Sequence, residues 1–238
     1  QAEAFMRSTI EKRLVDSLSG MRLFNEIKML LNENHPVRCI RRVRELGLFH
    51  YVSPEILKDP KELEILEKLD SVFSWAGMVN LPSTPEVWQV YFLGLTYSLE
   101  EEAFLKVADR LQLTTRLRTS LEKDRAYCRE NLKRWNANED WGPIEIYYAF
   151  ANLSVEAVLF YLALSSSDRL NQYANVYFTQ YQGIAEPALT GDDLVKMGME
   201  PGPVFQSVFN ALREARVAGK ISTREEEETL VKEQFLKP

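Results

Sequence analysis

Positively charged residues gather in one part of this 238-residue sequence, although the whole chain has a formal net charge of −6. Between Lys106 and Arg134, nine basic residues stand against four acidic ones. Four of the basic residues follow one another at intervals of seven, four and four, which places them on one face of a helix: Arg118, Arg125, Arg129 and Lys133. Cations spaced in this way can neutralise successive phosphates, so the stripe predicts contact with a nucleic-acid backbone. The alternative is an ordinary solvated face, because Glu122 lies on the same side.

A second candidate for anion binding is the stretch "LTGDDLVKMGMEPGP", residues 189 to 203. Thr190 and Asp193 have the spacing of a capping box, and Gly198 is a typical helix stop. The next helix is expected to begin near Pro203, directly after Gly202. Its first amides would then point outward and attract a phosphate. The alternative is a tight turn that joins two helices, and the acidic residues of the stretch weaken the anion hypothesis.

Three further basic residues complete the predicted RNA contacts, namely Arg110 and Arg116 from the basic segment and Lys220 near the C-terminal end. Metal chemistry is not predicted for this chain. Neither His35 nor His50 has a second ligand at helical spacing, and the glutamate runs lie at expected helix starts, where capping and the helix dipole explain them. Cys39 and Cys128 are the only cysteines and are expected to be buried reduced thiols, which indicates a cytoplasmic protein.

The elements that must position these residues are predicted to be helices throughout. Apolar residues recur at helical spacing nearly everywhere, and alternation typical of strands is absent, so the predicted fold is all-α without a sheet. Three pairs have capping-box spacing: Ser98 with Glu101, Thr190 with Asp193, and Thr223 with Glu226. A subdomain boundary is expected at "WNANEDWGP", residues 135 to 143. The longest purely apolar run, residues 157 to 164, is too short to span a bilayer, so no membrane contact is predicted.

Several motifs resemble the C-terminal part of the bacterial class II tRNA nucleotidyltransferase and poly(A) polymerase family. The densest similarity is in "LTGDDLVKMGMEPGPVFQSVFNALREARVAGKISTREEEETLVKEQF", and "LSGMRLFNEIKMLL" with "RVRELGLFHYVSPEI" is similar to an upstream motif of the family. The resemblance implies neck helices in residues 1–34, a helical body in 35–135, and a helical tail in 136–238. Within this tail, the outward-facing helix start after Gly202 resembles the turn of a helix-hairpin-helix module, which is expected in residues 190–218.

The resemblance implies structural roles for two groups of residues. Arg22 and Glu26 match a family helix that supports the neck presenting the nucleotide pocket, although an ordinary surface pair is an equally good explanation. A second group matches the tail motif and is expected to hold two helices at a fixed angle: Thr190, Gly191, Asp193, Gly198, Pro201 and Pro203. Phosphate contact by Gly202 is secondary in this interpretation.

The catalytic head of the family is missing from the sequence. Such heads carry a Gly-Ser dipeptide and a D-x-D carboxylate pair for magnesium, and the chain contains neither. Because it also begins at Gln1, we expect a piece of a longer polypeptide that is inactive alone, with Mg²⁺ and ATP or CTP binding only at the absent head. The predicted function is to hold the acceptor and T-arm backbone of a tRNA and to position its 3′ end for that head. The alternative is an all-α protein-interaction or oligomerisation domain of a multidomain poly(A) polymerase-like protein. The sequence leaves open whether the parent adds CCA, CC, A or poly(A), and in what oligomeric state.

Overall fold

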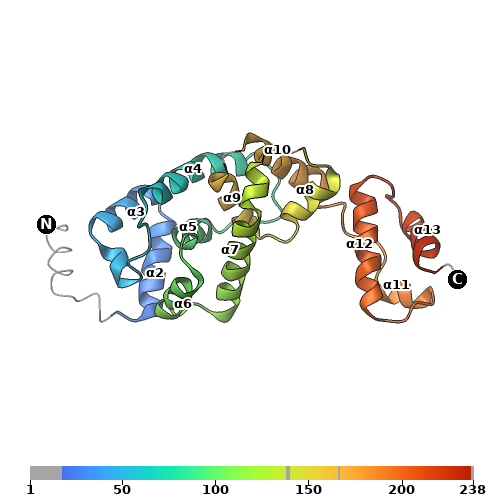
Figure 1. Cartoon of the computed structure of the whole chain (residues 1–238), viewed down its shortest axis with the longest axis horizontal. Helices are drawn as coiled ribbons and strands as arrows, with labels where there is room; N and C mark the ends of the chain where they lie inside the picture. The colour runs from blue at the N-terminus through green and yellow to red at the C-terminus, as the bar shows by residue number, and fades with distance from the viewer. Residues whose placement is uncertain (1–17, 138–139, 166, 237–238) are drawn as a thin grey trace. The chain divides into compact units, whose positions relative to one another are not determined.

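The computed structural model describes residues 18–137, 140–165 and 167–236. Within these ranges the chain forms twelve α-helices, one short 3₁₀ turn and one short π turn, and no strand (Figure 1). The predicted all-α class is therefore confirmed. The contacts divide the chain into two compact units: residues 1–137 with 153–167, and residues 138–152 with 168–238. The chain first passes from the first unit to the second after residue 137, within the boundary expected at 135–143. Residues 153–167 then belong to the first unit again.

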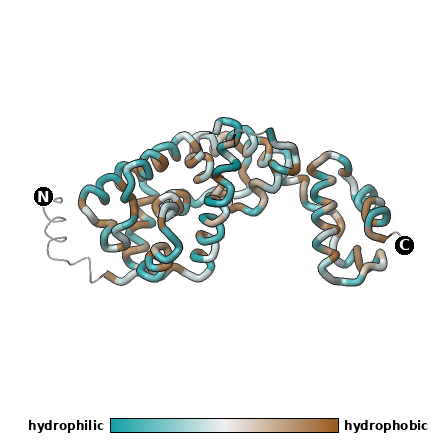
Figure 2. The backbone as a smooth tube through the Cα atoms, viewed as in Figure 1, coloured by the Kyte–Doolittle hydropathy of each residue, from teal (hydrophilic) through white to brown (hydrophobic). Residues whose placement is uncertain are grey.

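The described residues of the first unit form seven α-helices and the 3₁₀ turn. Their bounds are α2 (Gly20–Leu31), α3 (Pro36–Glu45), η2 (Leu48–Tyr51), α4 (Pro60–Ala76), α5 (Val87–Thr96), α6 (Glu101–Arg110), α7 (Thr115–Asn136) and α9 (Val155–Leu164). Helix α9 packs against α4 and α5, and α2 packs against α5. Every residue of α9 from Ala157 to Ala163 is buried, which a helix that is apolar all round requires. Figure 2 shows the other helices as mixtures of hydrophobic and hydrophilic residues.

The second unit contains α8 (Pro143–Phe150), α10 (Asp168–Val176), η3 (Tyr177–Tyr181), α11 (Gly191–Lys196), α12 (Pro203–Val217) and α13 (Arg224–Phe235). The last three helices surround a core of their own, made of Leu189, Leu194, Met199, Val208, Leu212, Ala215, Ile221 and Val231. Helix α12 also contacts α8, where the Tyr148 hydroxyl donates to Glu214 Oε1 at 3.0 Å. The segment that contains the glycine and proline turn is thus a small packed module.

The predicted helix caps are partly confirmed. Thr190 with Asp193 and Thr223 with Glu226 form capping boxes at the starts of α11 and α13. The prediction for Ser98 with Glu101 is wrong, because Glu100 is the N-cap of α6 and makes no side-chain cap bond. Both cysteines are free thiols, with Cys128 buried and Cys39 half-buried.

The described part of the chain contains no single helix that is long and apolar enough to cross a bilayer. Helices α8 and α9 reach the required length only together, as a pair bent by 109°.

Candidate nucleic-acid interface

Helix α7 carries the predicted stripe, and its packing decides which side chains reach solvent. The Thr114 hydroxyl caps its first turn by accepting from Leu117 N at 3.4 Å. Leu121, Cys128 and Trp135 are buried and recur every seven residues, so they mark the side of the helix that faces the core. A cation is available to a ligand only if it lies away from this side.

Arg125 lies next to the buried side and is itself 4% exposed. Its guanidinium donates to the carbonyl oxygen of Leu99 and lies 4.1 Å from the centre of the Phe104 ring. Burial, and then the neighbouring charge of Arg129, lower the pKa of Arg125 to about 10, which leaves it protonated at neutral pH. The structure disfavours the predicted role of Arg125 in RNA contact, because the side chain is enclosed by its own protein.

Arg129 and Arg118 also have partners within the protein. Arg129 is exposed, but its guanidinium donates to the carbonyl oxygens of Tyr97, at 2.8 Å, and of Leu99. These carbonyls follow the end of α5, where helices leave acceptors unpaired and favour a nearby cation. Arg118 pairs with Glu122 at 3.1 Å and with Asp109 at 3.2 Å. Of the four predicted stripe residues, only Lys133 is exposed without such a bond to another described residue.

A different set of cations faces solvent on α7. At about 100° per residue, Arg116, Lys123 and Arg134 lie within about 20° of one another, on the side away from the core. We call the exposed α7 face the four exposed cations Arg116, Lys123, Lys133 and Arg134, of which Lys133 lies about 80–100° round the helix from the other three. Glu130 is the one acidic residue among them. The face spans about 27 Å along the helix axis, so spaced cations are present on α7 but are rotated from the predicted position.

Arg110 has a structural position in the first unit. Its Nε donates to Tyr51 O at 3.1 Å, and its Nη1 donates to Leu18 O at 3.4 Å. Its own carbonyl oxygen lies within clashing distance of where a Cβ on Gly20 would stand, so only glycine fits at the start of α2. These contacts fasten the beginning of α2 to the end of α6, and the Arg110 side chain is already occupied by protein carbonyls.

Arg22 and Glu26 are both exposed on α2. Among the described residues no hydrogen bond or ion pair joins their side chains. The backbone N–H of Arg22 donates to Ser19 Oγ at 3.3 Å, which caps the helix. The surface-pair explanation is thus not supported, and the supporting role implied by the resemblance stays a prediction.

The residues of the tail turn fix α11 against its neighbours. Asp193 Oδ2 accepts from the N–H of Thr190 at 2.9 Å, and Asp193 Oδ1 pairs with Arg224 on α13 at 2.8 Å. The Arg224 guanidinium first, and then the donors of Thr190, hold the pKa of Asp193 far below its usual range. Gly198 has φ +94°, a conformation that favours glycine, and lets Met199 N donate back to Leu194 O at 3.0 Å.

Gly202 differs from Gly198, because nothing inside the protein requires a glycine there. Its backbone is extended, with φ 172° and ψ −170°, and a Cβ would meet no atom within 4 Å. Pro201, Gly202 and Pro203 are all exposed, and α12 begins at Pro203 without a side-chain cap. A Cβ at Gly191 would make only ordinary contact with the ring of Phe205, at 3.7 Å. The turn is therefore open to a ligand, and phosphate binding by Gly202 stays a prediction.

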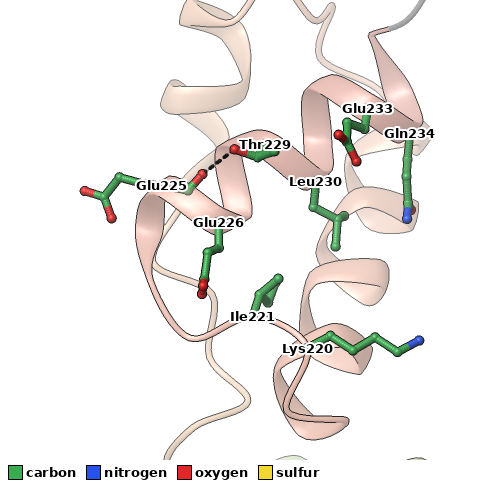
Figure 3. A pocket seen from close by; sticks show the side chains of 8 residues that line it. All are labelled: Lys220, Ile221, Glu225, Glu226, Thr229, Leu230, Glu233 and Gln234. Carbon is green, nitrogen blue, oxygen red and sulfur yellow. Dashed lines mark hydrogen bonds between the residues drawn. The ribbon is translucent and has the colours of Figure 1, made fainter.

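Lys220 lies at the edge of a shallow hollow between the α12–α13 turn and α13 (Figure 3). Three glutamates line the same hollow, Glu225, Glu226 and Glu233, and Figure 3 shows the Glu225 carboxylate pointing away from Lys220. Glu226 is bound to the α13 cap, where its Oε2 accepts from Thr223 N at 3.0 Å. A hollow with three acidic side chains and one lysine disfavours phosphate, so Lys220 is a poor candidate for RNA contact.

One pair that the sequence did not single out holds the tail together. Glu227 has no exposed surface, and its carboxylate accepts from Ala188 N at 3.0 Å and from Leu189 N at 2.9 Å. Arg216 on α12 pairs with the same carboxylate and also donates to Ile184 O at 2.7 Å. The available signal was spacing, because Glu227 lies four residues before the buried Val231.

Possible metal ligands are scattered over the residues that the structure describes. No group of three or more histidine, cysteine, aspartate or glutamate side chains there could hold a metal ion.

Comparison with known proteins places these features in context. Residues 2–59 match a family model described as "Probable RNA and SrmB- binding site of polymerase A". Across 94% of its length the chain is 32% identical to an A-adding tRNA nucleotidyltransferase of Geobacter sulfurreducens, of which it covers 26%. It is 20% identical to an A-adding tRNA nucleotidyltransferase of Halalkalibacterium halodurans over 92% of its length, and covers 47% of that protein.

Solved structures share the fold. A Thermotoga maritima CCA-adding enzyme complexed with tRNA has a TM-score of 0.75 and 18% identity, with 97% of this chain and 55% of that chain covered. A CCA-adding enzyme with ATP gives a TM-score of 0.76 at 18% identity, with 98% of this chain and 55% of that chain covered. The chain thus spans between a quarter and about half of the proteins that it matches. These matches bear out the resemblance seen in the sequence.

Proposed function

Because the chain corresponds to the C-terminal part of the bacterial class II tRNA nucleotidyltransferase and poly(A) polymerase family, we propose that it binds tRNA for a 3′-end-maturing enzyme. In this proposal it grips the backbone of the acceptor and T arms and positions the 3′ end for a catalytic head. The tRNA-bound state of the Thermotoga maritima relative supports the choice of ligand.

The observation that carries the proposal is the exposed α7 face. RNA duplexes present phosphates, 2′-hydroxyls and shape rather than readable base edges, so a protein can hold them with spaced cations. Arg116, Lys123 and Lys133 make no hydrogen bond or ion pair with another described residue, so their full charge is available to phosphates. Arg118 and Arg129 lie beside the face with partly occupied donors and contribute less.

The tail turn offers a second contact. Gly202 and the start of α12 expose backbone without side chains, which allows a phosphate to approach closely. Asp192 and Glu200 are exposed nearby and limit its strength. We therefore assign the larger share of affinity to α7 and the smaller share to the Gly202 turn.

No reaction step is assigned to the chain. In the proposal Mg²⁺ and ATP or CTP bind at the head of the longer protein, and the residues here bind and orient RNA. Two free cysteines, one of them buried, are typical of a reducing compartment, so we place the protein in the cytoplasm. A protein-interaction or oligomerisation domain is the competing function, and the exposed methionines Met21 and Met29 on α2 favour it.

A direct binding experiment distinguishes tRNA binding from the protein-interaction function. The purified chain is titrated with labelled tRNA in a gel-shift or anisotropy assay, while light scattering reports its mass with and without RNA. We expect a monomer that binds tRNA and binds a tRNA acceptor-T-arm minihelix with similar affinity. A tight dimer that ignores both RNAs would instead establish the competing function.

A further inference from the structure

Two adjoining hollows of the first unit share the side chain of Phe73 and lie apart from the residues of the exposed α7 face. One hollow is lined by Glu33, Asp70, Phe73 and Tyr91, where the α2–α3 turn meets α4 and α5. The other continues along the end of α4 and the following loop, past Ala76, Val79, Leu81, Pro82 and Pro85. We call the two together the α4 groove. No lysine or arginine lines either part among the described residues.

The two carboxylates at one end of the α4 groove can still accept hydrogen bonds from a ligand. Asp70 Oδ1 accepts from the Tyr91 hydroxyl at 3.2 Å, which leaves its other oxygen for a second donor. Burial, and then the charge of Asp70, raise the pKa of Tyr91, so the phenol stays a donor. The side chain of Glu33 is exposed and makes no hydrogen bond or ion pair with another described residue.

Apolar side chains line much of the rest of the α4 groove, together with the polar residues Asn34, His35, Asn80, Ser83 and Thr84. Phe73 stacks on Tyr91 with ring centres 5.9 Å apart and an angle of 28° between the planes. Pro82 and Pro85 lack backbone donors and fix their own φ angles, so they add an apolar wall with restricted backbone. Met78 stands next to Gly77 in the same loop with 80% of its surface exposed.

The charge of the α4 groove indicates which kind of ligand it binds. Two carboxylates repel RNA but attract a guanidinium, whose planar donors fit carboxylate oxygens and whose flat face stacks on an aromatic ring. We propose that the α4 groove docks an extended segment of a separate protein, with an arginine between Glu33 and Asp70. Apolar or proline residues of the segment then lie over Leu81 and Pro82. The chain would thereby hold RNA and a protein partner on different surfaces.

Three blocked hexapeptides test this proposal on the whole 238-residue chain. The probe is acetyl-PLRLPL-amide, and its comparisons carry glutamate in place of arginine, or serine in place of each leucine. Binding is followed by backbone amide NMR shifts, with Gly77 and Asn80 as reporters inside the groove. We expect the arginine peptide to bind at least about ten times more tightly than the glutamate peptide, and the serine peptide to be weakened several-fold.

Substitutions in the chain then test whether the arginine peptide binds in the α4 groove. The double variant Glu33→Gln, Asp70→Asn should lose the preference for arginine, while the new amide oxygen still accepts from Tyr91. Glu64→Gln, an exposed change elsewhere on α4, is the control and should bind as the unaltered chain does. Equal binding of the arginine and glutamate peptides, shifts confined to other residues, or no binding at millimolar peptide with an intact spectrum would each overturn the proposal.

A competition experiment separates this inference from the proposed RNA function. Saturating tRNA should leave the affinity for the arginine peptide unchanged, because no lysine or arginine lines the α4 groove among the described residues. A ten-fold loss of peptide affinity on adding tRNA would place RNA in the groove and contradict the docking of a protein segment there. If the chain fails to bind tRNA at all, the peptide measurements still decide the docking proposal.

Discussion

The carboxylate of Glu227 on α13 forms an ion pair with Arg216 on α12 and is fully buried. Two backbone amides, of Ala188 and Leu189, complete its shell, so one side chain binds the last two long helices to the segment before α11. The buried charge is fully paired, which is the condition under which such a group is tolerated.

Removal of one partner of this pair is expected to lower the urea concentration at which the tail unfolds. Glu227→Ala leaves Arg216 and two amides without their acceptor, so the free energy of unfolding should fall by about 3 kcal/mol. Urea unfolding followed by far-UV circular dichroism measures the loss. Glu225→Gln, an exposed change in the same helix turn, is the matched control and should alter stability by less than about 0.5 kcal/mol. Equal effects of the two variants would contradict the assigned role.

Asp193 gives the tail a predicted dependence on pH. Its pKa is lower in the folded chain than the ordinary 3.8, because Arg224 and Thr190 stabilise the carboxylate. A carboxyl of this kind stabilises the fold above its unfolded pKa and loses that contribution as pH falls through the folded pKa. Thermal unfolding of the tail should therefore shift to lower temperature as pH falls below about 4. In Asp193→Asn the remaining pH dependence should be shallower, and an unchanged dependence would contradict the assignment.

The two tail glycines should respond differently to alanine. Gly198→Ala forces a side chain into the left-handed region and should cost about 1 kcal/mol of stability. In Gly202→Ala the added Cβ meets no atom and the extended backbone is allowed for alanine, so the free energy of unfolding should hardly change. If a phosphate approaches Gly202, this variant should still weaken tRNA binding, by two- to five-fold. Unchanged tRNA affinity in Gly202→Ala would limit the turn to a structural role.

Arg125 is expected to act on stability alone. Arg125→Ala removes a donor from Leu99 O and leaves space beside Phe104, so the free energy of unfolding should fall by about 2 kcal/mol. Binding of tRNA, measured where the variant is fully folded, should be unchanged. A large loss of tRNA affinity at unchanged stability would restore Arg125 to the predicted stripe.

The sequence supported the fold class and the tail caps because both depend on local patterns. Helical periodicity and the Thr190 and Thr223 boxes are visible within a few residues, and the structure confirms them. The position of the α7 cations was not predictable in the same way. Intervals of seven and four placed Arg118, Arg125 and Arg129 on one face, but only tertiary contacts with the carbonyls after α5 show that Arg125 is buried and that the Arg129 guanidinium is already bonded. Glu227 was missed because the run of four glutamates does not itself show which one is enclosed, and only the four-residue spacing from Val231 indicated the buried side.

The exposed α7 face is tested most directly by the salt dependence of tRNA binding. The triple variant Arg116→Glu, Lys123→Glu, Lys133→Glu is compared with Lys68→Glu, an exposed reversal on α4, over a range of salt concentrations. We expect the triple variant to bind at least ten-fold more weakly at low salt, with a plot of log K against log salt whose slope is flatter by about two to three, while Lys68→Glu should match the unaltered chain. The same slope and affinity in all three proteins would contradict the claim that α7 holds the RNA backbone.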